Sequence, residues 1–194
     1  MKFTPTEVAG AFVVEIEKFS DARGWFARTW CARELEAQGL ETRLVQCSAS
    51  FNHKAGTLRG MHYQAAPHGE VKLVRATSGS AFDVAVDLRP ESPTYLEHVA
   101  VDLNEENQRA LYVPERFAHG YQTLVDNTHT SYQVGEFYAP QHEGGLKFDD
   151  PRLGLDWPLP VASMSPKDAQ WKLLGEVEPE VRRRMSLAPA GAST

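Results

Sequence analysis

At 194 residues the chain is long enough for one domain with a substantial core and short for two, so we predict a single domain over 1–194 with its core at about 10–176. Hydrophobic residues make up 42% and charged residues 24%, which excludes a disordered or fibrous chain. The net charge of −6 at pH 7 argues against nucleic acid or an anionic membrane as partner, so an anionic substrate needs a local basic pocket.

The first predicted element is a helix at 31–38, with Leu35 and Leu40 as its apolar contacts. Runs at 71–77 and 81–88 alternate as half-buried strands do, and we predict a hairpin that turns through Ser78-Gly79-Ser80. Further short strands are predicted at 98–103, 110–113, 120–125 and 130–135. Many short strands with close turns indicate an all-β sandwich or barrel.

The C-terminal part adds two short helices to this barrel. Ser165 and Pro166 have the pattern of an N-cap followed by proline at the first helical position. A second helix is predicted at about 178–185, and the tail at 188–194 is expected to be disordered.

Cysteine content and hydropathy predict the compartment. Cys31 and Cys47 lie far apart and follow no secretory leader pattern, so we expect free thiols in a cytoplasmic protein. No stretch approaches the roughly 20 apolar residues that cross a bilayer, so no membrane partner is expected.

Two histidines lie in runs typical of a small metal-binding barrel, namely His62 in Leu58-Arg59-Gly60-Met61-His62-Tyr63-Gln64 and His119 in Pro114-Glu115-Arg116-Phe117-Ala118-His119-Gly120. A metal site of this kind needs a second histidine where Gln64 stands and a carboxylate near Lys72. We therefore expect no metal. The remaining base, cation and arginines suit proton abstraction beside a carbonyl, and we interpret the chain as an enzyme.

Three side chains, those of His62, Lys72 and Tyr132, admit a structural as well as a chemical interpretation. A lone strand histidine such as His62 is more often structural, but a pKa of about 6.5 suits a base if a carboxylate orients its other nitrogen. Asp168 is our candidate for that carboxylate. Lys72 is either solvated or an inward cation that stabilises an enolate oxygen. Tyr132 is either a barrel tyrosine or a phenol that returns a proton to carbon.

Loop residues have the same double interpretation. Arg23 and Arg59 each precede a glycine, which suits either surface ion pairs or bidentate phosphate contacts. Tyr138 would stack on a base or cap the barrel, and Glu143 is a ligand acceptor or a loop charge.

A set of short motifs occurs in a fixed order: Asp21-Ala22-Arg23-Gly24, Leu58-Arg59-Gly60-Met61-His62-Tyr63-Gln64, Lys72-Leu73-Val74-Arg75, Asp83-Val84-Ala85-Val86-Asp87-Leu88-Arg89, Ser92-Pro93-Thr94, Pro114-Glu115-Arg116-Phe117-Ala118-His119-Gly120, Asp149-Asp150-Pro151 and Ser165-Pro166-Lys167-Asp168. Over about 19–174 this set resembles the dTDP-4-dehydrorhamnose 3,5-epimerases. The resemblance implies a cupin-like double-stranded β-helix, a jelly-roll barrel without metal or cofactor. It also implies a homodimer in which N-terminal segments reach the partner.

Residue roles follow from the same resemblance. It implies His62 as the base, Asp168 as its orienting partner, Tyr132 as the acid on the opposite face of the sugar and Lys72 beside the C4 oxygen. It places the following side chains around the nucleotide sugar: Arg23, Phe26, Arg28, Gln46, Ser48, Arg59, His119, Tyr138, Glu143 and Lys167.

Departures from the family pattern gather where the family reads the nucleotide base. Arg28 stands in place of a glutamate, Cys47 and Ser48 follow Gln46 in place of Asp-Asn, and Gln133 replaces a lysine after the acid tyrosine. We infer, as a hypothesis, that the catalytic half is intact and that thymidine recognition is altered.

The predicted function is epimerisation at C3, C5 or both of a nucleotide-linked 4-keto-6-deoxyhexose through an enolate. The first candidate reaction converts dTDP-4-dehydro-6-deoxy-D-glucose into dTDP-4-dehydro-L-rhamnose. Alternatives are a single-carbon epimerase on a differently based nucleotide sugar, an isomerase that moves the keto group, and a non-catalytic sugar-nucleotide binding cupin. Retention of both His62 and Tyr132 argues against the last.

Overall fold

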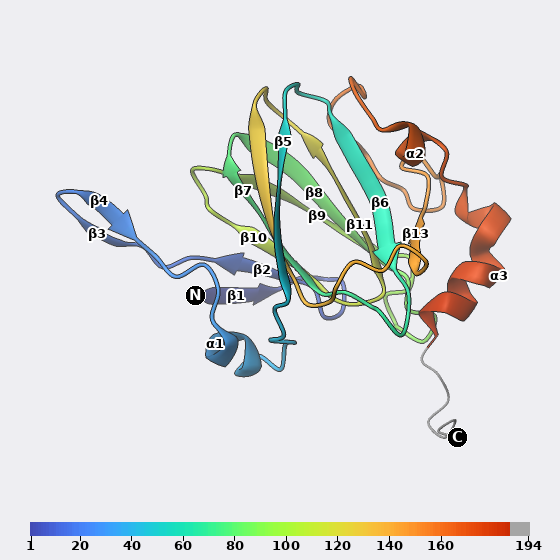
Figure 1. Ribbon diagram of the computed structural model, residues 1–194, viewed down its shortest axis with the longest axis horizontal. Helices are drawn as coiled ribbons and strands as arrows, with labels where there is room; N and C mark the ends of the chain where they lie inside the picture. The colour runs from blue at the N-terminus through green and yellow to red at the C-terminus, as the bar shows by residue number, and fades with distance from the viewer. Residues whose placement is uncertain (187–194) are drawn as a thin grey trace.

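The computed structural model describes residues 1–186, so the expectation for 188–194 lies outside the described residues. Two antiparallel sheets face each other and form the predicted jelly-roll barrel (Figure 1). The larger sheet runs β1 (Lys2–Pro5), β2 (Phe12–Glu15), β10 (Ala110–Val113), β7 (Lys72–Ser78), β12 (Thr128–Val134) and β5 (Gln46–Asn52). The smaller sheet runs β13 (Glu143–Gly145), β6 (Leu58–Gln64), β11 (Phe117–Thr123), β8 (Ser80–Asp87) and β9 (His98–Asn104).

The hairpin predicted from 71–77 and 81–88 is wrong, because β7 and β8 lie in opposite sheets. β7 pairs with β10 and β12, whereas β8 pairs with β9 and β11. Gly79 carries the chain between them at φ 72°, where an added Cβ would lie 2.6 Å from the Thr128 hydroxyl. Both strands are also buried on both faces rather than half-buried as predicted, because other elements cover their outer sides. Alternation of residue types does not indicate the neighbouring strand.

The remaining predicted strands are confirmed within three residues at each end, since β9 and β10 begin at the predicted residues and β11 begins at Phe117. The three helices α1 (Ala32–Glu36), α2 (Pro166–Ala169) and α3 (Leu174–Met185) also match the prediction in place. Helix α3 begins four residues earlier than predicted, because Leu174 is buried and its backbone N–H donates to Asp150. No helix in the described range 1–186 is long and apolar enough to span a membrane.

The space between the sheets is apolar at one end and polar at the other. Leu111, Val113 and Phe117 fill the apolar end. On β6, Met61 and Tyr63 point outward into a cluster that α3 covers, so His62 points inward by alternation. The strand register therefore delivers polar side chains to the open end of the barrel, where the site lies.

A separate hairpin of β3 (Phe19–Asp21) and β4 (Gly24–Phe26) projects away from the barrel (Figure 1). Its aromatic side chains are largely uncovered in one copy of the chain, and Phe26 is 76% exposed. Isolated two-stranded hairpins are marginally stable in water, so a structure that covers these rings would stabilise the hairpin.

Candidate active site

The centre of the site is a hydrogen-bonded imidazole and carboxylate from distant parts of the chain. Nε2 of His62 lies 2.7 Å from Oδ1 of Asp168, and the two residues are 106 positions apart. Helix α2 presents the carboxylate, because the Ser165 hydroxyl accepts the Asp168 backbone N–H at 3.0 Å. Gly60 donates its backbone N–H to Oδ2 at 3.3 Å. The site therefore holds Asp168 from both the helix and strand β6.

Electrostatics keep this carboxylate ionised at neutral pH. Burial alone would raise the pKa of Asp168, but hydrogen bonds from His62 and Gly60, together with the charge of the imidazolium, lower it below its ordinary value. In the tautomer in which Nε2 of a neutral His62 donates to the ionised Asp168, Nδ1 carries a free lone pair. The geometry thus prepares His62 to act as a base.

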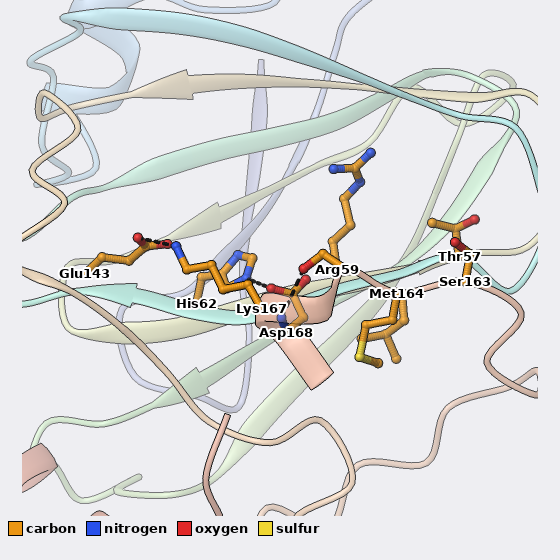
Figure 2. Close-up of a pocket in the computed structure, with 10 residues that line it drawn as sticks. Thr57, Arg59, His62, Glu143, Ser163, Met164, Lys167 and Asp168 are labelled. Carbon is orange, nitrogen blue, oxygen red and sulfur yellow. Dashed lines mark hydrogen bonds and ion pairs between the residues drawn. The ribbon is translucent and has the colours of Figure 1, made fainter. Parts of the chain in front are cut away.

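An open cavity of about 380 Å³ lies over this pair (Figure 2). Its lining residues are Thr57, Leu58, Arg59, His62, Glu143, Ser163, Met164, Ser165, Lys167 and Asp168. Lys167 points to Glu143 and forms an ion pair with it (Figure 2), and the Tyr138 hydroxyl donates to the same carboxylate at 2.7 Å. Burial would raise the pKa of Glu143, but these two contacts lower it. Both charges are therefore present at the cavity mouth.

Two further rings line the interior beside the base. His119 on β11 pairs in register with His62 on β6, and its Nε2 lies 3.0 Å from Asp83 Oδ1. Tyr132 on β12 belongs to the opposite sheet, and its ring centroid lies 6.4 Å from that of His119. Burial first, and then the neighbouring phenol of Tyr121, raises the pKa of Tyr132 well above its ordinary value. Tyr132 therefore presents a neutral phenol across the interior from the two imidazoles.

Comparison with known proteins shows to which family the polypeptide belongs. The model of the family described as dTDP-4-dehydrorhamnose 3,5-epimerase matches residues 5–176. The chain belongs to the dTDP-4-dehydrorhamnose 3,5-epimerase family. The resemblance of the sequence motifs is thereby confirmed, and the protein is an isomerase of the epimerase type.

Relatives and solved structures cover nearly the whole chain. The dTDP-4-dehydrorhamnose 3,5-epimerase of Methanothermobacter thermautotrophicus is 42% identical over 90% of this chain and 95% of its own length. The crystal structure of a dTDP-6-deoxy-D-glucose-3,5-epimerase from Legionella pneumophila, in complex with dTDP-4-keto-L-rhamnose, is 37% identical with a TM-score of 0.87, covering 93% of this chain and 96% of that one. A 3'-monoepimerase from Streptomyces bikiniensis in complex with dTDP-quinovose is 28% identical with a TM-score of 0.83, covering 92% and 90%.

In this epimerase Lys72 lies on the inward side of β7 but not in the wall of the 380 Å³ cavity. It shares that side with Val74, which pairs in register with Tyr132. Its ammonium lies 2.8 Å from the Glu70 carboxylate, and its side chain is 12% exposed. Glu70 is thus the counter-charge that makes burial of this lysine possible, and sequence reasoning missed it.

The base-reading positions predicted from the family divide between two places. Gln46 and Ser48 lie on β5, where Ser48 pairs in register with Tyr132 and Gln46 accepts the Tyr138 backbone N–H at 2.7 Å. Arg28 lies outside the barrel and pairs with Glu34 at 2.6 Å.

Arg23 and Phe26 do not reach the cavity of their own chain. Both lie on the projecting hairpin, and the Arg23 side chain is 90% exposed with Asp21 as its ion-pair partner. The structure therefore brings the barrel residues of the predicted set together and leaves the hairpin residues apart.

Gln64, at the position where a metal ligand would stand, holds loops instead. Its amide nitrogen donates to the carbonyls of His68 and Phe137, and its amide oxygen accepts the Ala139 backbone N–H at 2.8 Å. This buried amide fixes the loop that leads from Tyr138 toward Glu143. Its sequence signal was its position two residues after His62 on the same side of β6.

Proposed function

We propose that the cavity, together with the polar barrel interior beside it, binds a nucleotide-linked 4-keto-6-deoxyhexose and that the epimerase inverts both C3 and C5, converting dTDP-4-dehydro-6-deoxy-D-glucose into dTDP-4-dehydro-L-rhamnose. The observation that carries this proposal is the hydrogen-bonded His62 and Asp168 pair in one sheet, with the Tyr132 phenol in the facing sheet. A base and an acid from opposite walls are what inversion requires. One base alone would mostly return the proton to the side from which it came.

The C4 ketone makes the protons on C3 and C5 acidic, because the resulting carbanion is an enolate. His62 takes each proton through Nδ1, while Asp168 stabilises the imidazolium that forms. Lys72 holds the C4 oxygen, and a well-placed donor to such an oxyanion is worth roughly 3 kcal/mol. Tyr132 then donates its proton from the other side of the ring.

The nucleotide diphosphate requires cations, and two are available at the cavity. Arg59 uses Nε to bind Asn52 at 2.8 Å, and within residues 1–186 its guanidinium has no carboxylate partner. Its remaining N–H groups suit bidentate binding of phosphate. Lys167 lines the same cavity, where its side chain extends toward Glu143 (Figure 2). Tyr138, 58% exposed, offers a ring for the base.

The epimerase is further proposed to be a homodimer in which the β3–β4 hairpin enters the site of the partner. The exposed Phe26 and Arg23 support this arrangement, because neither contributes to the cavity of its own chain. A cytoplasmic location is proposed from the two free thiols, Cys31 and Cys47.

Mixing two inactive variants tests this shared site. Arg23→Ala and His62→Asn homodimers should each have little activity, but refolding an equal mixture should restore about a quarter of the wild-type sites, because half of the dimers then hold one intact site. Activity of the mixture no higher than the mean of the two variants would contradict sharing. The activity of the same equal mixture before refolding gives the baseline that is expected without sharing.

Nucleotide selectivity is expected to differ from that of a dTDP-specific site, because Arg28, Cys47, Ser48 and Gln133 replace the family's residues where the base is read. Calorimetric titration with dTDP, UDP, CDP and GDP should show affinities within about tenfold of one another, a spread of about 1.4 kcal/mol. A clear preference for dTDP would end this hypothesis.

The reaction itself is tested by NMR with dTDP-4-keto-6-deoxyglucose in deuterated water. The proposal predicts deuterium at both C3 and C5 together with inversion at both carbons. Label and inversion at one carbon only would support a single-carbon epimerase, the activity named for the Streptomyces bikiniensis protein. Binding without label would support the non-catalytic cupin.

A further inference from the structure

A chain of hydrogen bonds runs through the barrel interior from the cavity to the phenol of Tyr132. Its links are Arg59 Nε to Asn52 Oδ1 at 2.8 Å, Asn52 Nδ2 to Tyr121 Oη at 3.1 Å, Tyr121 Oη to Ser50 Oγ at 2.7 Å, Ser50 Oγ to Thr130 Oγ1 at 2.6 Å, and Thr130 Oγ1 to Tyr132 Oη at 3.1 Å. The last three links join hydroxyl groups, which both donate and accept protons.

Strand register brings these side chains together. Thr130 and Ser50 are partners across β12 and β5, and Tyr121 is the partner of Arg59 across β11 and β6. Thr130 and Tyr121 are each only 1% exposed. Ser50 is partly exposed and lies on β5, which is the edge strand of its sheet. Of the three hydroxyl side chains that lead to Tyr132, Ser50 is thus in reach of solvent, whereas Tyr121 and Thr130 are buried, and Tyr132 itself is partly exposed.

The side-chain oxygen and nitrogen of Asn52 fix the direction of the hydrogen bonds in this network. Arg59 Nε can only donate, so the Asn52 side-chain oxygen is its acceptor, and Nδ2 also donates to the Thr128 carbonyl at 3.2 Å. With Nδ2 donating to Tyr121, the Tyr121 hydroxyl donates to Ser50, Ser50 to Thr130, and Thr130 to Tyr132. Three other contacts, from Thr130 to Tyr121 at 3.4 Å, from Tyr121 to Asn52 Oδ1 at 3.4 Å and from Asn52 Nδ2 to Ser50 at 3.5 Å, are beyond normal hydrogen-bond length.

This direction matches what an acid at Tyr132 needs. The Tyr132 oxygen accepts from Thr130, so its own proton is free to point at a bound sugar. Once that proton has left, a buried phenolate remains, and an unpaired buried charge is costly. The proton must be replaced from solvent before the next inversion. Hydrogen bonds that point the same way strengthen one another and suit this transfer.

We infer that Thr130 and Ser50 form a proton relay that reprotonates Tyr132 after each inversion, with Tyr121 orienting Ser50. This inference rests on the proposed role of Tyr132 as the acid. Tyr132 forms the new C–H bond and becomes a phenolate; Thr130 passes its proton to that phenolate, Ser50 passes its proton to Thr130, and a solvent acid restores Ser50. His62 releases to solvent the proton that it took from carbon. One proton leaves and one enters in each inversion, and no electrons are exchanged.

The test compares inversion with exchange in deuterated water. His62 can return a deuteron to the side from which it took a proton, so exchange with retention does not need Tyr132. Thr130→Val, which keeps the shape and β-branching, should lower the ratio of inversion to exchange about tenfold or more, since general acid catalysis contributes about 10²–10⁴. Ser50→Ala should do the same. Thr130→Ser should restore the ratio, because it returns the hydroxyl.

Ser131→Ala is the matched control, because Ser131 neighbours Thr130 on β12 and its side chain points to the other side of the sheet. Thermal melting of every variant checks the fold. A ratio equal to that of the wild type in both Thr130→Val and Ser50→Ala would overturn the relay, and so would an equal fall in exchange and inversion. Absence of exchange in the wild-type enzyme would instead overturn the proposed function.

Discussion

Replacement of His62 by asparagine is expected to abolish deuterium incorporation at both C3 and C5 of the keto-sugar. The asparagine amide lies near the position of Nδ1 and ends short of the Nε2 position, which is 2.7 Å from Asp168 Oδ1, so the substitution also removes the pair with the carboxylate. The amide has no lone pair of suitable basicity where Nδ1 stood. The loss should be about 10³-fold or more in the exchange rate, because general base catalysis contributes about 10²–10⁴.

The measurement is the rate at which the C3 and C5 proton signals disappear in deuterated water. His98→Asn is the matched control, because His98 is an exposed histidine on β9. It should exchange as the wild type does. Exchange in His62→Asn within a few-fold of the wild type would remove His62 as the base and favour a protein that binds the sugar nucleotide without reacting with it.

Replacement of Tyr132 by phenylalanine is expected to separate exchange from inversion. Phenylalanine keeps the ring that packs against His119 and Tyr121, at centroid distances of 6.4 and 6.5 Å, and removes only the hydroxyl. Proton abstraction by His62 continues, and the deuteron returns to its original side. Inversion should fall at least about 10²-fold, the lower range for loss of a general acid.

Product formation is measured by NMR on the same samples as exchange, so that the ratio does not depend on enzyme concentration. Tyr95→Phe serves as the control, because Tyr95 does not line the cavity and its hydroxyl contacts Glu178 at 3.4 Å. If Tyr132→Phe still inverts at the wild-type rate, the acid is another group, and the relay inferred for Thr130 and Ser50 has no role.

Local patterns in the sequence were sufficient for the parts of the fold that depend on neighbouring residues. Alternation located the strands, and Ser165 with Pro166 located the start of α2, because these signals arise from contacts within a few positions. The motifs around His62 and His119 pointed to a barrel and to the family, which the match over residues 5–176 confirms.

Tertiary structure decided which distant residues meet. The alternation of residues at β7 and β8 would be the same whether the two strands paired or lay in opposite sheets. The tertiary structure places them in opposite sheets, each hydrogen-bonded to other strands. The hydroxyl chain from Ser50 to Tyr132 likewise leaves no local pattern, because Ser50, Tyr121 and Thr130 come from separate strands whose order and register bring them within hydrogen-bond distance. Glu70 is only two positions before Lys72, but its role as the counter-charge depends on the burial of both side chains. The sequence by itself thus determined the residue types and the side of each strand on which they lie, whereas the stacking of two sheets determined the contacts between them.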